Sequence, residues 1–138
     1  MSYSRPALVK GSFSGIVDSM TINQLNAQAP FVTADGSSIR SLLDTTNAPV
    51  QNQSLAEAAL PPGGETQRHY HKLSEEFYYI TEGCGEMEID GEVCTVATGD
   101  AILIPAGAWH QIKATGENGV RLLCCCSPPY SHDDTYFD

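Results

Sequence analysis

The chain is poor in basic side chains. Only 7 lysines and arginines stand against 17 aspartates and glutamates, which gives a formal net charge of -10, and the basic residues are scattered along the sequence. Because nucleic acid is bound through clustered lysine and arginine, this shortage excludes nucleic acid as an expected partner. The acidity also disfavours an anionic membrane surface, and solubility is its simplest explanation.

Long apolar runs are missing as well. No stretch of about eighteen apolar residues occurs, so we expect no segment that spans a membrane. The start of the chain, MSYSRPALVKGSFSG, lacks the charged and then apolar order of a secretory signal. We therefore expect a cytoplasmic protein.

The cysteines do not form a recognisable redox or disulfide motif. Their number, 5, is odd, the expected compartment is reducing, and no Cys-x-x-Cys pair is present. In a strand, Cys124 and Cys126 would share one face and Cys125 would take the other. We favour small apolar packing for these three over thiolate ligation or redox chemistry.

Turn residues and short apolar segments dominate what remains. A chain of 138 residues that is 41% hydrophobic suits one domain, and 12 glycines and 8 prolines separate short strand patterns. The run LAEAAL would also fit a helix by propensity. We predict an all-β barrel or sandwich with strands over residues 38–43, 53–60, 66–71, 76–81, 86–89, 92–97, 101–104, 109–114 and 120–126.

The two ends of the chain are interpreted separately from the barrel, which we place at residues 38–127. Residues 1–37 are expected to form an arm that packs on the barrel or on a partner subunit. In it we predict a strand over 7–9 and a short helix over 22–28, capped by Thr21 and ended by Pro30. Residues 128–138 are predicted to be a surface or interface tail, and His132 in this tail is not expected to bind metal.

Three histidines and one glutamate form a candidate metal site. His69 and His71 lie two apart in a predicted strand, so their imidazoles leave the same face roughly 7 Å apart. Glu76 follows after a short turn, and His110 comes from a later strand; Glu75 would point the opposite way. Three nitrogens and one oxygen suit one divalent transition metal, with Fe, Mn, Ni, Co and Zn all open, and leave room for substrate.

The spacing of these residues resembles the two-part pattern of the cupin superfamily. Five residues separate Gly63 from His69, one separates the two histidines, four lead to Glu76 and six to Gly83. The second part runs from Gly99 through Pro105 and Gly107 to His110, with five, one and two residues between them. Only the last position departs, where Ala114 replaces an asparagine that is not a ligand in the family.

The resemblance is close over residues 63–110 and looser from about 39 to 126, and it is strongest to small single-domain bacterial cupins. It implies a double-stranded β-helix, the cupin jelly-roll barrel, with a metal in its mouth and frequently a homodimer. Cupins include dioxygenases, sugar isomerases and epimerases, lyases, decarboxylases and non-catalytic binding domains, so the fold leaves the reaction open.

We expect a metal-dependent enzyme that acts on a small organic molecule by dioxygenase-like or lyase-like chemistry. The alternative is a non-catalytic, metal-containing module that binds a sugar or small acid, or a sugar isomerase or epimerase. Tyr78 could donate a proton and Gln67 could orient a substrate, while Trp109 could form a wall of the pocket. Each of these also has a packing interpretation, and Glu57 is left open between the cavity and solvent.

Overall fold

The computed structural model describes residues 19–138, and within this range the chain forms strands and two short 3-10 helices but no α-helix. The elements are η1 (Leu25–Ala27), β1 (Phe31–Val32), β2 (Ser38–Leu43), β3 (Ser54–Leu60), β4 (His69–His71), β5 (Glu75–Ile89), β6 (Glu92–Ala97), β7 (Ala101–Ile104), β8 (His110–Ser127), η2 (His132–Asp134) and β9 (Thr135–Phe137). The all-β prediction is confirmed, and LAEAAL lies in a strand. The strand predicted over 7–9 is outside the described residues.

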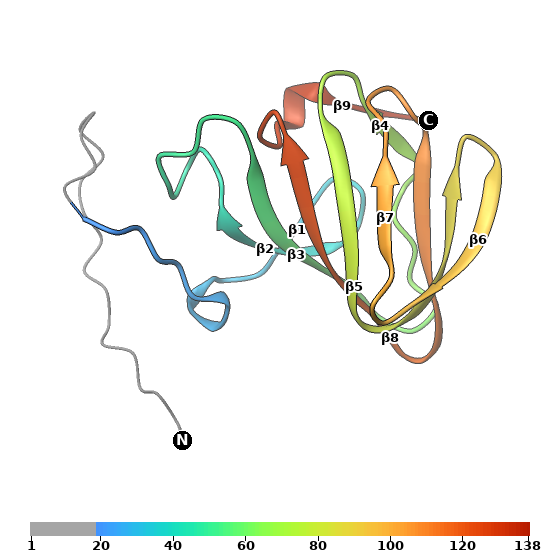
Figure 1. Cartoon of the computed structure of the whole chain (residues 1–138). Helices are drawn as coiled ribbons and strands as arrows, with labels where there is room; N and C mark the ends of the chain where they lie inside the picture. The colour runs from blue at the N-terminus through green and yellow to red at the C-terminus, as the bar shows by residue number, and fades with distance from the viewer. Residues whose placement is uncertain (1–18) are drawn as a thin grey trace.

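The two longest strands, β5 and β8, join the two layers of the barrel because each bends and runs through both. One layer contains β1, β2, β3, the second half of β8, the first half of β5, and β7. The other contains β9, β4, the first half of β8, the second half of β5, and β6. All neighbours are antiparallel, and the curled layers form the predicted jelly-roll barrel (Figure 1).

The bend in β5 changes which residues face the interior. Glu76, Tyr78 and Ile80 are buried before the bend, whereas Gly85 and Met87 are buried after it. The pairing with β8 shifts register between Ile80 and Cys84, and an inserted residue reverses the alternation of a strand. The separate strands predicted on either side of this point are therefore one bent strand, which carries Glu76 into the interior.

The interior between the layers is filled by branched aliphatic side chains. Ile80, Ile104 and Ile112 are at most 1% exposed, and Val120 and Leu122 pack in the same cluster. Tyr78 belongs to this cluster and is 5% exposed. The metal-site strands are thus supported from inside by a packed apolar core.

The helix predicted over 22–28 is wrong. Only one 3-10 turn forms, η1, and the side chain of Gln24 rather than Thr21 caps it by accepting a hydrogen bond from the backbone N–H of Ala27. No residue of η1 is buried, and a short helix without a packed face is marginal in water. Within the part of the chain described, no helix is both long enough and apolar enough to cross a membrane.

The C-terminal segment, predicted to be a surface or interface tail, is mostly exposed but adds a strand to the edge of the barrel. β9 pairs with β4, with His71 opposite Thr135 and His69 opposite Phe137. The buried carboxylate of Asp134 accepts hydrogen bonds from the backbone N–H groups of Leu73 and Ser74, in the turn after β4. The segment completes the edge of the sheet that carries two of the candidate ligands.

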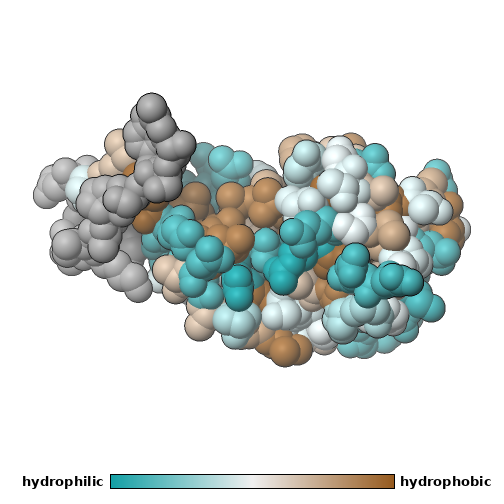
Figure 2. Space-filling view, turned by 90° about the horizontal axis from the view of Figure 1, so that it is seen from below, coloured by the Kyte–Doolittle hydropathy of each residue, from teal (hydrophilic) through white to brown (hydrophobic). Residues whose placement is uncertain are grey.

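Polar and apolar side chains are interleaved on the surface. Figure 2 shows one face on which polar side chains are widespread and apolar ones gather in separate patches. On the outer side of β5 and β7, the neighbouring residues Phe77 and Leu103 are 52% and 54% exposed, and Tyr79 beside them is 47% exposed. These three side chains form an exposed apolar surface on the outer face of the two strands.

Candidate metal centre

Three imidazoles meet inside the barrel. β4 contributes His69 and His71, and β8 begins with His110, which is paired with His69 across the two strands. One ring nitrogen from each lies within 4.8 Å of the others, and all three side chains are buried. The ring centroids of His69 and His110 are only 4.2 Å apart.

The carboxylate of Glu76 completes the group. Its Oε1 atom lies 3.4 Å from Nε2 of His71 and 3.4 Å from Nε2 of His110. Glu76 is 5% exposed, whereas Glu75 is exposed on the outside of the strand. The structure thus brings together the four side chains proposed from the sequence and leaves Glu75 away from them.

Backbone carbonyls fix the tautomers of two of the imidazoles. Nδ1 of His69 lies 2.7 Å from the carbonyl oxygen of Gln67, and Nδ1 of His110 lies 3.0 Å from that of Ala108. A carbonyl oxygen only accepts hydrogen bonds, so each Nδ1 must carry the proton and donate it. The Nε2 lone pairs of both rings are therefore left for another partner.

A hydroxyl group fixes the tautomer of His71 in the same way. Thr135 Oγ1 donates to the carbonyl oxygen of Ser131 at 3.0 Å and lies 3.2 Å from Nδ1 of His71. Because the hydroxyl proton is used on Ser131, the hydroxyl accepts from the Nδ1–H of His71. Metal-binding histidines are typically oriented by such bonds at the other ring nitrogen, so all three rings fit metal coordination through Nε2.

Two of the converging atoms have no hydrogen-bond partner among the described residues. They are Oε1 of Glu76 and Nε2 of His110, and both are buried. A buried polar atom left unpaired costs about 1–3 kcal/mol. Nitrogen and carboxylate donors arranged in this way fit a divalent transition metal, which would satisfy both atoms.

The charges of the group shift its pKa values. Burial alone would raise the pKa of Glu76, but its close contacts with His110 and His71 outweigh burial and lower the pKa to about 2. Burial alone would lower the pKa of His71, but its contact with Glu76 raises the pKa above the ordinary value. Burial and the neighbouring His110 lower the pKa of His69. Glu76 is therefore an anion at neutral pH.

Metal affinity is expected to fall as the pH is lowered. Binding requires unprotonated Nε2 atoms, and the raised pKa of His71 means that a proton competes there from a higher pH than at an ordinary histidine. Below that pKa we expect a loss of about tenfold or more in affinity per pH unit. Competition titrations with Zn²⁺ from pH 8 to pH 5 measure this affinity as a function of pH. His132→Gln, at an exposed histidine, should leave the profile unchanged; a flat profile would contradict the assignment.

A cysteine holds the other oxygen of the carboxylate. Cys126 is paired with Glu76 across β8 and β5, and its thiol donates to Oε2 at 3.2 Å. Burial, with the adjacent charge of Glu76, raises the pKa of Cys126, so the group remains a thiol and a donor. The prediction that Cys126 serves only apolar packing is therefore incomplete, because its thiol also orients Glu76. The prediction that Cys124 and Cys126 share one face of the strand is confirmed, because both line the cavity.

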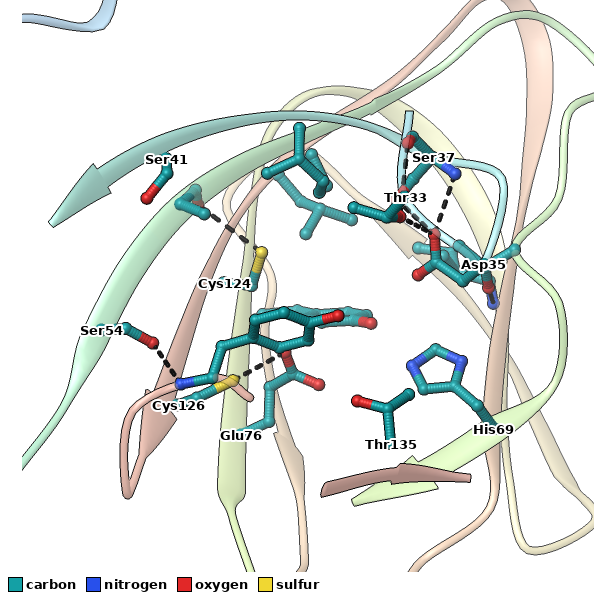
Figure 3. Close-up of a pocket in the computed structure, with 18 of the residues that line it drawn as sticks. Thr33, Asp35, Ser37, Ser41, Ser54, His69, Glu76, Cys124, Cys126 and Thr135 are labelled. Carbon is teal, nitrogen blue, oxygen red and sulfur yellow. Dashed lines mark hydrogen bonds between the residues drawn. The ribbon is translucent and has the colours of Figure 1, made fainter. Parts of the chain in front are cut away.

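Three of the four residues, His69, His71 and Glu76, line a cavity whose empty volume, counted together with the open solvent at its mouth, is about 870 Å³ (Figure 3). Most of the wall is apolar, and no lysine or arginine is among its lining residues from the described part of the chain. Tyr78 lines it, and its ring centroid is 6.1 Å from that of His110. A small molecule in this cavity would therefore lie next to His69 and His71.

Two residues that sequence analysis proposed for the cavity lie elsewhere. Gln67 is exposed and absent from the lining, because β4 begins at His69 and strand alternation does not extend back to it. Only its carbonyl oxygen reaches the site. Trp109 lies on the side of the chain opposite to the inward-facing His110. Its ring centroid is 4.6 Å from that of Tyr70 and 5.1 Å from Cζ of Arg68.

The remaining candidates are also outside the cavity lining. Glu57 is 8% exposed but is bound to Arg121 at 3.0 Å, so neither alternative left open for it applies. His132 is exposed and is not in the histidine cluster. The structure adds a carboxylate that sequence analysis missed, Asp35, which lines the cavity between β1 and β2. The dipeptide Asp35-Gly36 is a turn signal that could have indicated a hairpin there.

The sequence is similar to a known protein family and to several individual proteins. A family model described as Cupin domain matches residues 56–126. An uncharacterised protein of Methanocaldococcus jannaschii is 48% identical over 106 residues, which are 77% of this chain and 85% of that protein. Shorter matches are 5-nitrosalicylic acid 1,2-dioxygenase of Bradyrhizobium sp., at 41% over 56 residues, and dimethylsulfoniopropionate lyase DddW of Ruegeria pomeroyi, at 35% over 82 residues.

The last two matches are partial. They cover 41% and 59% of this chain, and 27% and 53% of the dioxygenase and the lyase. Among solved structures, KdgF from Halomonas sp. has a TM-score of 0.71 at 17% identity, covering 83% of this chain and 98% of that one. A predicted oxalate decarboxylase from Thermotoga maritima has a TM-score of 0.70 at 22% identity, covering 78% and 98%. These two likenesses show the shared fold.

Proposed function

The chain belongs to the cupin-domain family, and from this premise we propose that it is an enzyme in which His69, His71, His110 and Glu76 hold one divalent transition metal. The observation that carries the proposal is the convergence of the unpaired Oε1 of Glu76 and Nε2 of His110, in a group of which His69, His71 and Glu76 line an apolar cavity. A metal that served only stability would more commonly sit in a closed tetrahedral site. Fe, Mn, Ni, Co and Zn all suit this donor set.

The bound metal would polarise an oxygen of a small organic substrate and stabilise negative charge on it. The chain's own residues orient the site. Gln67 and Thr135 act as positioning residues on His69 and His71, and Cys126 does so on Glu76. The catalytic side chain we assign is Tyr78. Burial raises its pKa well above the ordinary value, so the phenol stays protonated at neutral pH and can donate a hydrogen bond, or a proton to a strongly basic substrate oxygen.

Lyase-like chemistry is the reaction class we favour. It moves protons and needs no oxidant, and the cavity offers a proton donor in Tyr78 and a carboxylate in Asp35. The partial similarity to a protein named as a lyase agrees with it. Dioxygenase-like chemistry is the second candidate, because a relative is named as a dioxygenase and such a reaction asks little of the side chains beyond the metal site.

We further infer a cytoplasmic homodimer. All five cysteines are free, which suits a reducing compartment. The exposed outer face of Phe77, Tyr79 and Leu103 offers an apolar surface of the kind that protein contacts bury. Sedimentation of wild-type protein and of Phe77→Ser tests the dimer, which the variant is expected to weaken.

Metal-dependent turnover with and without oxygen tests the proposed function. Metal-free protein is loaded separately with Fe²⁺, Mn²⁺, Ni²⁺, Co²⁺ or Zn²⁺ and given hydroxycarbonyl compounds, diketones and catechols. We expect at least one metal to support elimination or isomerisation under nitrogen, followed by NMR, and Tyr78→Phe to slow it by about 100-fold or more. Turnover only with oxygen uptake would favour the dioxygenase. Metal binding with no turnover, while sugars or small acids raise the melting temperature, would refute the enzyme and favour a binding module.

A further inference from the structure

Asp35 is held rigidly at the cavity wall. Its Oδ1 atom accepts three hydrogen bonds, from Thr33 Oγ1 at 2.5 Å, from the backbone N–H of Ser37 at 2.9 Å and from Ser37 Oγ at 2.6 Å. Ser37 is itself only 1% exposed. A carboxylate bound in this way has little freedom to turn away from the cavity.

The backbone of Asp35 ties this carboxylate to the metal-site strand. Its carbonyl oxygen accepts a hydrogen bond of 2.7 Å from the N–H of Gln67, two residues before His69. Figure 3 shows Asp35 and His69 on the same side of the cavity, with Glu76 and Cys126 on the other. Burial lowers the pKa of His69 and raises that of Tyr78, and the carboxylate of Asp35 is close enough to add a smaller upward contribution to each. Asp35 therefore lies within electrostatic reach of the proposed metal site.

The second carboxylate oxygen is left for a ligand. Oδ2 of Asp35 accepts no hydrogen bond from the residues that the structure describes. Asp44, the other aspartate of the lining, differs: Thr46 and Asn47 donate to its Oδ1, and Ser41 donates to its Oδ2. Burial alone would raise the pKa of Asp44, but these bonds lower it. Asp44 is a structural carboxylate, whereas Asp35 presents a free acceptor.

The charge of the lining restricts what can bind. Asp35, Asp44 and Glu76 are its carboxylates, and among the lining residues from 31 to 137 no lysine or arginine offsets them. A substrate carboxylate or phosphate placed away from the metal would lose its hydration without gaining a cation. Near Asp35 it would also meet a like charge in a mainly apolar cavity, where charges are weakly screened.

We propose that Asp35 determines the specificity of the cavity: its Oδ2 accepts a hydrogen bond from a hydroxyl or N–H group of the substrate. The substrate is uncharged and largely apolar, and its metal-binding oxygen atoms face the histidine cluster. Substrates with an anionic group at this position are rejected. The proposal rests on the proposed function and adds the substrate class. A hydroxyl that meets a fixed acceptor gains selectivity over analogues that lack it, because an analogue that displaces water from this acceptor without replacing the hydrogen bond leaves it unpaired.

Binding of substituted catechols to Zn²⁺-loaded protein tests this without relying on turnover. The probes are catechols that carry a methyl, a hydroxymethyl or a carboxylate substituent, placed either on the ring carbon next to a hydroxyl-bearing carbon or on the following carbon, and calorimetry gives their Kd values. In wild type, the best hydroxymethyl probe should bind at least about tenfold more tightly than its carboxylate analogue. It should also bind more tightly than its methyl analogue.

Three variants separate Asp35 from its surroundings. Asp35→Asn keeps the oxygen that Thr33 and Ser37 bind, removes the charge, and should reduce the discrimination against carboxylate to about threefold or less. Asp35→Glu keeps the charge and should still reject the carboxylate. The matched control Asp44→Asn should retain the wild-type ratio, and melting curves verify folding of all three.

The outcomes are distinguishable from failure of the proposed function. Wild type that binds Zn²⁺ but binds the carboxylate and hydroxymethyl probes equally would overturn the role of Asp35 alone. So would an Asp35→Asn variant that folds, binds Zn²⁺ and keeps the wild-type ratio. Failure of wild type to bind Zn²⁺ would overturn the metal site, and the specificity proposal with it.

Discussion

Protein with His110→Ala is expected to lose nearly all of its metal. His110 is 0% exposed, its Nε2 is 3.4 Å from Oε1 of Glu76, and its Nδ1 is fixed by Ala108. Removing an oriented imidazole takes one donor from the set, and we expect affinity to fall by at least about 100-fold, since loss of an outer partner alone costs 10–100-fold. Metal content after equilibrium dialysis at a fixed free concentration measures it.

Two neighbouring glutamates provide the matched comparison. Glu76→Gln removes the anionic oxygen next to His71 and His110, and should also lose most of the metal. Glu75→Gln makes the same chemical change at an exposed position and should retain wild-type metal content. Equal losses at the two positions would mean that β5 presents the other face to the metal.

Gly119→Ala is expected to be the most destabilising small substitution in β8. Gly119 has a φ of +74°, which costs an L-residue about 1–2 kcal/mol, and a Cβ atom there would lie 2.2 Å from the carbonyl oxygen of Leu60. That backbone atom belongs to β3 and cannot move without disturbing the sheet. We expect a loss of more than about 3 kcal/mol in the free energy of unfolding, measured by urea denaturation.

A second glycine separates the two causes. Gly63 has a φ of +75°, but a Cβ atom there would have no neighbour within 4 Å. Gly63→Ala should therefore cost only the conformational strain, about 1–2 kcal/mol. If the two variants lost the same free energy of unfolding, the clash between a Cβ atom at Gly119 and the backbone of β3 would not be the cause of the loss.

Local spacing was enough to predict which four side chains meet. Strand alternation places His69 and His71 on one face and separates Glu76 from Glu75, and the cupin-like count adds His110 from a distant segment. The all-β class followed from turn residues and short apolar runs. These features are encoded within a few residues, so they could be predicted without knowing how the strands pair.

Features that depend on pairing between distant strands could not be predicted in the same way. Cys126 meets Glu76 only because β8 and β5 pair in one register, and Thr135 reaches His71 only because β9 adds to β4. Asp35 lies at the cavity because β1 folds back on β2 and its carbonyl bonds to Gln67. Neither composition nor periodicity specifies these long-range registers.

The outward position of Trp109 makes it a built-in optical probe. It is the only tryptophan of the chain, it precedes His110 directly, and it contacts the ring of Tyr70 and the guanidinium of Arg68. A change in the backbone at His110 on metal binding is expected to move the indole relative to these two neighbours. Its fluorescence emission can thus report metal loading in real time, in unlabelled protein and without a substrate.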